Sequence, residues 1–197
     1  DVHALRPGNS AGNGSLGRTA PVALAHLGHD AEIARQARAI SSLTHADPLC
    51  GDACVLWCIA IDRAVREARL NGIDDGLTLL PGSTRNRWAH RVAEARRDPP
   101  ARFVPNGFVV TALQTALAAI EHTARAATGG PEHHVRLALQ AAIAVGHDTD
   151  TVGAITGALV GARWGACAFP PGWVEPLHGW PGFDAAALGE LALRVAD

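Results

Sequence analysis

The chain has 197 residues, of which 48% are hydrophobic and 18% are charged, and its formal net charge is −2. This balance excludes an intrinsically disordered chain, and the near-neutral charge excludes a polybasic nucleic-acid-binding protein. We therefore expect a single domain over residues 1–197. No apolar run approaches the roughly 20 residues that cross a bilayer. No segment resembles a signal peptide either, so we expect a cytoplasmic protein that does not contact membranes.

Apolar residues recur at three- and four-residue spacing along most of the chain, and this spacing predicts helices. The opening residues 1–15 are rich in Gly, Asn and Ser and lead to a helix start at Pro21. Further helices are expected over residues 30–43, 51–70, 84–97, 109–126, 132–145, 149–164 and 185–195. No segment convincingly predicts a strand, so the predicted fold class is all-α.

The expected helices differ in their predicted place in the molecule. Residues 84–97 are more charged and are predicted to be peripheral, whereas the Ala- and Leu-rich helices 109–126 and 132–145 are predicted to be central. Residues 72–83 are predicted to form a polar connection without a helix, because turn-forming residues dominate there. Residues 169–183 are predicted to form a Pro-rich aromatic loop.

Three of the four cysteines, Cys50, Cys54 and Cys58, repeat every fourth residue within a helical pattern. Such a face could hold zinc, although zinc sites usually need a fourth ligand and a closer pairing. Free cysteine also behaves as a small core hydrophobe. We therefore interpret the three thiols as core residues, with zinc as the alternative.

The predicted helix 149–164 carries glycine at every fourth position, namely at Gly153, Gly157 and Gly161, with Gly165 following. Each glycine in a helix interior costs roughly 1 kcal/mol relative to alanine. The close approach of a neighbouring helix would offset that cost. This pattern predicts a buried central helix whose amino-terminal end is a rigid platform for chemistry.

An acidic cluster, Asp148-Thr149-Asp150-Thr151, precedes and opens this helix. Two carboxylates and two hydroxyls form an oxygen-only set of donors, which suits a hard cation such as Mg²⁺ or Mn²⁺. The alternative is that Asp148 only caps the helix while Asp150 interacts with its dipole. Capping does not explain the second carboxylate, so we favour metal ligation.

The sequence Gly-x-Asp-Thr-Asp-Thr-x-x-Ala-Ile-x-Gly-Ala, which starts at Gly146, resembles the carboxy-terminal metal motif of ADP-ribosylglycohydrolases. The resemblance implies a compact orthogonal helical bundle. It also implies that Asp148, Asp150 and Thr151 are ligands of a two-metal Mg²⁺ or Mn²⁺ centre. The two aspartates would then act in catalysis through the metals.

The segment from Ser10 to Ser15 is a short glycine loop that is followed by Arg18 and Pro21. Backbone N–H groups in such a loop can approach an anion, although Gly-Asn-Gly is also an ordinary turn. The segment resembles the family loop that cradles the pyrophosphate of ADP-ribose, with Gly17 where Met is usual. The residues with an implied substrate-binding role are Ser10, Gly12, Asn13, Gly14 and Ser15.

Two further residues are candidate substrate contacts. His45 lies in a Thr-His-x-Asp-Pro stretch similar to one that lines the ADP-ribose cleft in the family, although a single His at a helix end is usually a structural hydrogen-bonding residue. Phe108 lies in a stretch similar to one in which an aromatic residue borders the nucleotide, and it could equally belong to the core. Residues 177–182 resemble the tail of bacterial members, in which we expect Trp180 to pack against the protein.

Family members normally open with a helix that carries a Thr-Asp-Asp segment, and this sequence has none. The adjacent pair Asp74-Asp75 resembles surface residues of a loop. The resemblance therefore covers the whole chain but about two thirds of a family domain. We expect the remaining metal ligands to lie upstream in an amino-terminal segment that is absent here. A second chain that completes the domain and a degenerate site are the alternatives.

These patterns predict a metal-dependent hydrolase that cleaves the glycosidic bond between ADP-ribose and a modified protein side chain or a related conjugate. A non-catalytic ADP-ribose-binding module or a degenerate family member is the first alternative, and a helical scaffold without a ligand is the second. The expected partners are ADP-ribose or an ADP-ribosylated protein, with no direct nucleic-acid binding.

Overall fold

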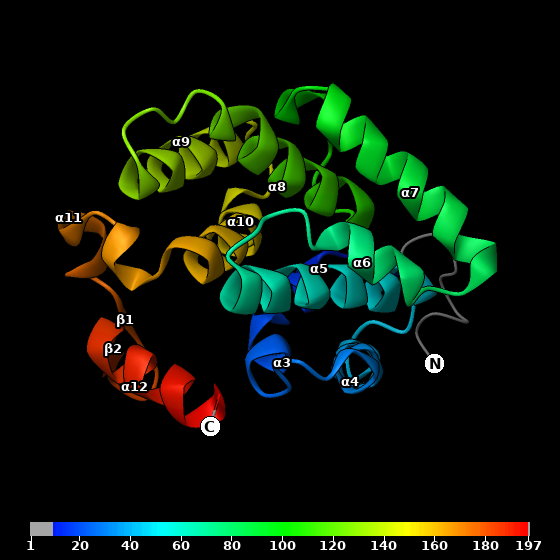
Figure 1. The fold of residues 1–197 in the computed structure, drawn as a ribbon, viewed down its shortest axis with the longest axis horizontal. Coiled ribbons are helices and arrows are strands. Elements are labelled where there is room, and N and C mark those ends of the chain that lie inside the picture. Colours follow the sequence, from blue (N-terminus) through cyan, green and yellow to red (C-terminus); the bar gives the residue numbers. More distant parts are fainter. Residues whose placement is uncertain (1–9, 197) are drawn as a thin grey trace.

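The computed structural model describes residues 10–196, which form helices packed around a shared core (Figure 1). The first part of the expected glycine-rich opening, residues 1–9, lies outside the described residues. The predicted all-α class is confirmed, because the regular structure of the described part is almost entirely helical. The exception is an antiparallel pair of two-residue strands, β1 (His178–Gly179) and β2 (Phe183–Asp184).

Helix α5 (Pro48–Glu67) runs through the middle of the core. Asp47 caps it by accepting a hydrogen bond from the Leu49 N–H at 2.9 Å, and proline occupies the first helical position. Every residue from Cys50 to Ala64 is buried. The helix is surrounded by α4 (Asp30–Ser42), α8 (Val109–Ala124) and α10 (Thr149–Trp164).

Helices α8, α9 (Pro131–Ile143) and α10 pack against one another on one side of α5. The predicted central place of α8 is confirmed, since all its residues from Ala112 to Ile120 are buried. The Trp57 Nε1–H of α5 donates to the Ile155 carbonyl of α10 at 3.1 Å. This bond fixes α10 against the middle of the molecule.

Residues 72–83, predicted to lack a helix, contain α6 (Ile73–Thr78). A Cβ on Gly76 would lie 3.1 Å from the Leu56 Cα, so glycine allows α6 to approach α5 closely. Helix α7 (Gly82–Arg97) forms the outer edge in Figure 1, as expected for a peripheral helix. It nevertheless buries Trp88 fully, with Nε1–H donating to Asp52 at 3.2 Å.

The glycines of α10 line an apolar groove of about 870 Å³ between this helix, α3 (Ala20–Leu24) and α12 (Ala185–Ala196). The atoms nearest to added Cβ groups on Gly153 and Gly157 belong to side chains of α9, at 3.8 and 3.7 Å. The neighbouring helix expected along this stripe is therefore α9, which approaches it through side chains at ordinary contact distance. The glycines also line the groove.

The tail after α10 includes η2 (Ala166–Ala168), α11 (Pro171–Val174), the two short strands and α12. Trp180 is 92% exposed, so the expectation that it packs against the protein is wrong. Its position between β1 and β2, at the tip of the hairpin, directs the indole away from the core. Within residues 10–196 no helix combines the length and apolarity needed to span a membrane.

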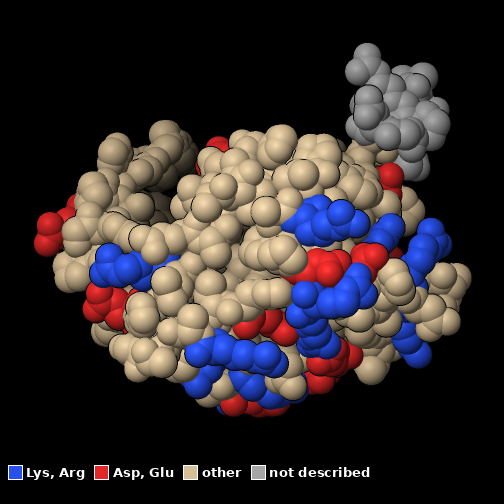
Figure 2. Space-filling view, turned by 90° about the horizontal axis from the view of Figure 1, so that it is seen from above, with Lys and Arg blue, Asp and Glu red and all other residues tan. Residues whose placement is uncertain are grey.

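Basic and acidic side chains lie next to one another on the face shown in Figure 2. Among the described residues, the most buried cluster of ion pairs centres on Arg63 of α5, which binds Asp30 at 2.6 Å and Asp75 at 2.7 Å and also contacts Asp62. Asp75 also binds Arg69. The described arginines of this region therefore serve to hold α4, α5 and α6 together.

Candidate functional site

Three segments that are distant in the sequence meet at the predicted site: the glycine loop, the residues before α8 and the turn before α10. The glycine loop pairs with the second segment through an isolated antiparallel bridge between Gly12 and Phe108. The Asn13 N–H donates to the Gly107 carbonyl at 3.1 Å, and the Val109 N–H donates to the Ala11 carbonyl at 2.9 Å. The loop is thereby fixed to the start of α8.

Asn13 joins the glycine loop to the acidic cluster. Its Nδ2 donates to the Asp148 Oδ2 at 2.8 Å and to the Asn106 carbonyl at 2.9 Å. The side chain is 6% exposed, so these bonds are largely screened from water. The structure thus brings together two predicted parts of the site, the loop and the carboxylate.

The turn before α10 has an unusual backbone. Gly146 and His147 both have positive φ angles, 79° and 61°, which glycine adopts readily and histidine rarely. Asn106 bonds to both sides of His147. Its Nδ2 donates to the Gly146 carbonyl at 3.1 Å, and its Oδ1 accepts from the Asp148 N–H at 2.9 Å.

Asp148 occupies the N-cap position of α10, but within residues 10–196 its side chain makes no capping hydrogen bond. The Thr151 N–H donates to the Asp150 Oδ1 instead, at 2.9 Å. Burial raises the pKa of Asp148, while hydrogen bonds with the side chains of Asn13, Thr151 and Asp150 lower it and prevail. Asp148 is therefore a carboxylate at neutral pH, and its hydrogen bond from Asn13 directs it.

The donors at this turn fit a hard divalent cation. Asp148 and Asp150 are close enough to interact, and no described Arg forms an ion pair with either carboxylate. The Thr151 side chain adds a hydroxyl beside Asp148, so the donors are all oxygens, as Mg²⁺ and Mn²⁺ prefer. No group of three or more His, Cys, Asp or Glu that could hold a metal occurs within residues 10–196. A complete centre would need further ligands.

Gly17 ends α2 (Gly14–Gly17), the short helix that follows the loop. A Cβ at position 17 would lie 2.9 Å from the Thr151 Cγ2, a distance that real Cβ atoms essentially never show. Glycine at position 17 therefore avoids a steric clash with Thr151 in this chain. Gly17 lets α2 lie directly against the methyl group of Thr151.

The predicted substrate-binding serines differ in their surroundings. The Ser15 hydroxyl is buried, accepting hydrogen bonds from the Ser41 hydroxyl at 2.9 Å and from the Cys54 thiol at 3.7 Å. Its side chain therefore faces the core, and only its backbone remains for a ligand. Ser10, at the start of the described residues, is partly buried.

Arg18, which follows the glycine loop, donates a hydrogen bond to the Thr44 hydroxyl at 2.5 Å. This bond connects Arg18 to the segment that follows α4.

His45 lies directly against the glycine loop. Its Nε2 would be 3.4 Å from a Cβ on Gly12, and its Cε1 would be 3.3 Å from a Cβ on Gly14. The two glycines therefore make room for the imidazole. Burial and the charge of Arg18 lower the pKa of His45, and its Nδ1 is 2.7 Å from the Thr44 hydroxyl. A neutral imidazole thus borders the loop.

Phe108 lies on the other side of the bridge, at the N-cap position of α8, and is 40% exposed. This exposure does not fit the alternative in which Phe108 belongs to the core. Its backbone pairs with that of Gly12 in the glycine loop. A contact with a nucleotide stays a prediction.

The three cysteines of α5 are free, buried thiols that lie beneath the loop and α2. Cys50 donates to the Gly12 carbonyl at 3.4 Å, and Cys58 donates to the Thr19 carbonyl at 3.5 Å. Burial raises the pKa of both thiols to about 12. All three cysteines are completely buried in the hydrophobic core, as the interpretation as core residues predicted.

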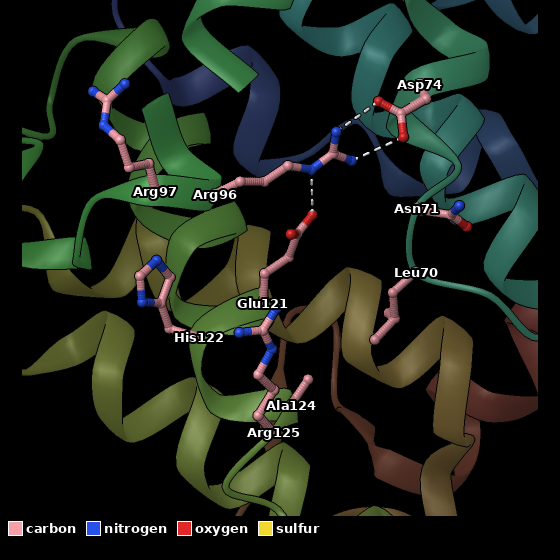
Figure 3. A pocket seen from close by; sticks show the side chains of 9 residues that line it. All are labelled: Leu70, Asn71, Asp74, Arg96, Arg97, Glu121, His122, Ala124 and Arg125. Atoms are coloured by element: carbon pink, nitrogen blue, oxygen red, sulfur yellow. Dashed lines mark hydrogen bonds and ion pairs between the residues drawn. The ribbon is translucent and has the colours of Figure 1, made fainter. Parts of the chain in front are cut away.

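A second hollow, of about 640 Å³, lies between α6, α7 and α8 and shares no lining residue with the predicted site (Figure 3). Arg96 extends across it, donating to both Asp74 oxygens at 2.9 Å and to Glu121 at 3.0 Å. Asp74 is exposed as predicted, but it stands in the first turn of α6 and not in a loop. Arg96, Asp74 and Glu121 therefore pair with one another, whereas Arg97 pairs with Asp98, which does not line the hollow.

Comparison with known proteins places the chain in a family. The model of the ADP-ribosylglycohydrolase family matches residues 2–197, so the chain belongs to this family. It is 29% identical over 173 residues to the ADP-ribosyl-[dinitrogen reductase] glycohydrolase of Rhodospirillum rubrum, covering 85% of this chain and 51% of that protein.

A second relative is the ADP-ribosylarginine hydrolase Tri1 of Pseudomonas putida (strain GB-1). The chain is 31% identical to it over 170 residues, covering 85% of this chain and 42% of that protein. The chain thus spans about half the length of the curated relatives it matches. Both relatives carry names of hydrolases that act on ADP-ribosyl groups.

Residue-level reasoning missed Asn106, which contacts both the glycine loop and the acidic turn. The sequence contained one usable signal, because a polar residue stands directly before Gly107 and Phe108 in a stretch that resembled the family. The two hydrogen bonds of the Asn106 side chain are made with backbone groups. Sequence patterns do not reveal such partners.

Proposed function

We propose that this chain forms part of a metal-dependent ADP-ribosylglycohydrolase, which cleaves the glycosidic bond between ADP-ribose and a modified protein side chain or a related conjugate. The observation that carries the proposal is the hydrogen bond from Asn13 to Asp148, since it joins an anion-binding type of loop to the Asp148 carboxylate. Membership of the family and the names of both relatives support it. The free thiols fit the reducing cytoplasm as its location.

Asp148, Asp150 and Thr151 would hold Mg²⁺ or Mn²⁺. When bound, the metal would supply Lewis-acid stabilisation of charge near the ribose and would position a water molecule. The two-metal centre would be completed by ligands from an amino-terminal segment or from a second chain. The residues of this chain would keep the donors in place, because Asn13 and Asn106 fix the carboxylate and the backbone of Asp148.

The glycine loop would bind the diphosphate of ADP-ribose through its backbone N–H groups. Phe108 would offer a face to the adenine, and the neutral His45 would hydrogen-bond a ribose hydroxyl or a phosphate oxygen. These contacts lie away from the bond that breaks. Their binding energy can therefore be used to orient the ribose at the reacting centre.

The test is release of ADP-ribose from an ADP-ribosylated arginine peptide by the complete protein in Mg²⁺ or Mn²⁺. Asp150 is exposed, so we expect Asp150→Ala to fold normally and to lose at least about 100-fold in turnover, because bound metal supplies several kcal/mol of stabilisation. Glu190→Ala, which removes an exposed carboxylate of α12, is the control. Unchanged turnover in Asp150→Ala would remove the proposed mechanism.

A non-catalytic ADP-ribose-binding module is the second candidate. It is favoured by the absence, within residues 10–196, of a cluster of three or more side chains of the metal-binding types. This candidate predicts that ADP-ribose binds without being released from a conjugate. Calorimetric titration of ADP-ribose with and without Mn²⁺, beside the hydrolysis assay, separates the two.

A further inference from the structure

Asn106 stands at the point where the three segments of the site meet. It is completely buried, although it lies outside the helices, just before α8. Its side-chain amide makes two hydrogen bonds, donating to the carbonyl of the residue before His147 and accepting from the N–H of the residue after it. Its backbone carbonyl accepts a hydrogen bond from the Asn13 Nδ2. One residue therefore contacts both the glycine loop and the acidic turn.

The amide bridge matters because of the backbone it spans. His147 holds a φ of 61°, in the left-handed region that residues with a Cβ rarely adopt. Such conformations persist when the surroundings determine them strongly. The two hydrogen bonds of Asn106 supply that support, since they bind the carbonyl before His147 and the N–H after it.

Asparagine meets this requirement in a specific way. An amide donates and accepts at the same time, whereas an aspartate side chain in its ionised form only accepts. Asn106→Asp would keep the acceptor for the Asp148 N–H and lose the donor for the Gly146 carbonyl. Asn106→Ala would lose both.

We propose that Asn106 is a positioning residue for the metal centre. It holds the turn at residues 146–148 so that the Asp148 carboxylate points to the metal, and it supports the Asn13 side chain that binds the same carboxylate. The inference rests on the proposed function, because it assigns a role to Asn106 within that site. Residues that orient a metal ligand typically change metal affinity by about 10–100-fold when they are replaced.

The structure offers a matched control on α8. Gln114 is also a buried amide, 4% exposed, and its Nε2 donates to the Arg91 carbonyl and to Glu94, each at 3.0 Å. Gln114→Ala therefore removes a buried amide with two hydrogen bonds, but it leaves the turn at residues 146–148 untouched. A loss of stability alone would be shared by the two variants.

The first measurement needs no metal. Hydrogen exchange of the Asp148 amide, followed in the complete protein, should be slow in the wild type and in Gln114→Ala and at least about tenfold faster in Asn106→Ala, because the acceptor of this N–H is lost. Asn106→Asp should retain most of the protection. An exchange rate in Asn106→Ala equal to that of the wild type would overturn the inference.

The second measurement is Mn²⁺ binding, followed by the electron paramagnetic resonance of free Mn²⁺ in the presence of ADP-ribose. Asn106→Ala should bind Mn²⁺ about 10–100-fold more weakly, Asn106→Asp should lie between, and Gln114→Ala should match the wild type. If Mn²⁺ binding is weakened equally in Asn106→Ala and Gln114→Ala, the role of Asn106 is purely structural and the inference is overturned. Wild-type protein that binds Mn²⁺ but releases no ADP-ribose would contradict the proposed function and leave the role of Asn106 standing.

Discussion

Asn13 and Asp148, which are 135 positions apart in the sequence, are joined by a hydrogen bond of 2.8 Å. The donor is buried and the acceptor is ionised, and hydrogen bonds of this charge-assisted kind are stronger than neutral ones. The glycine loop and the acidic turn therefore behave as one unit. A substitution in either segment should therefore affect the structure of the other.

Asn13→Ala should destabilise the fold by about 1–3 kcal/mol, because it removes both hydrogen bonds of a buried amide and leaves the Asn106 carbonyl without this donor. Urea unfolding followed by circular dichroism measures the change. Asn71→Ala, which removes an exposed amide, should change the free energy of unfolding by less than about 0.5 kcal/mol. Identical midpoints for wild type and Asn13→Ala would show that the bond contributes nothing to stability.

Phe108→Ala should weaken ADP-ribose binding without a matching loss of stability. Phe108 is 40% exposed, so less packing is lost than at a fully buried phenylalanine, whereas stacking of a base on an aromatic ring contributes about 1–3 kcal/mol. Isothermal titration with ADP-ribose should show a dissociation constant raised by about 5–100-fold. Leu43→Ala, at a residue that is 75% exposed on the other side of the loop, is the control. An unchanged constant in Phe108→Ala would exclude this contact.

The buried thiols should resist alkylation in the native protein. Burial raises the pKa of Cys50 and Cys58 to about 12, so the reactive thiolate is scarce, on the order of one molecule in ten thousand at pH 8. The exposed Cys167 should react first with iodoacetamide, as read by mass spectrometry of peptides. All four should react in urea. Rapid native labelling of Cys50 would mean that the glycine loop above it opens readily.

The ion pairs of α6 should make stability fall in acid. Burial raises the pKa of Asp75, but hydrogen bonds from Arg69 and Arg63 lower it and prevail. A lowered carboxyl pKa stabilises the folded state above the unfolded value, about 3.9, and this stabilisation is lost as the pH falls through the folded value. Thermal unfolding between pH 7 and about pH 2.5 should therefore show a shallower acid decline for Asp75→Asn. Parallel curves for the variant, the wild type and a Glu190→Gln control would contradict this.

Much of the fold could be predicted from apolar spacing. The predicted helix 149–164 coincides with α10 (Thr149–Trp164), and the prediction 109–126 extends two residues beyond the end of α8 at Ala124. Long helices with a regular apolar stripe carry this information locally. Helix α6 does not, since it has six residues and depends on the contact of Gly76 with Leu56, which only the folded chain creates.

The candidate site could be predicted in part, for a different reason. Oxygen donors at Asp148 and Asp150 follow from residue type, and their nearness to the glycine loop followed from the resemblance to the family. The inward turn of the Ser15 hydroxyl and the bridge made by Asn106 did not, because both depend on partners elsewhere in the chain. Local sequence patterns indicate which chemical groups are present, whereas tertiary packing determines the direction in which each side chain points.

The contact between Gly17 and Thr151 couples these two positions sterically. Any side chain at residue 17 would displace either α2 or the Thr151 methyl, and a displaced methyl would rotate the hydroxyl on the same carbon. Substitutions at this unremarkable glycine would be epistatic with a residue that we assign to the metal centre.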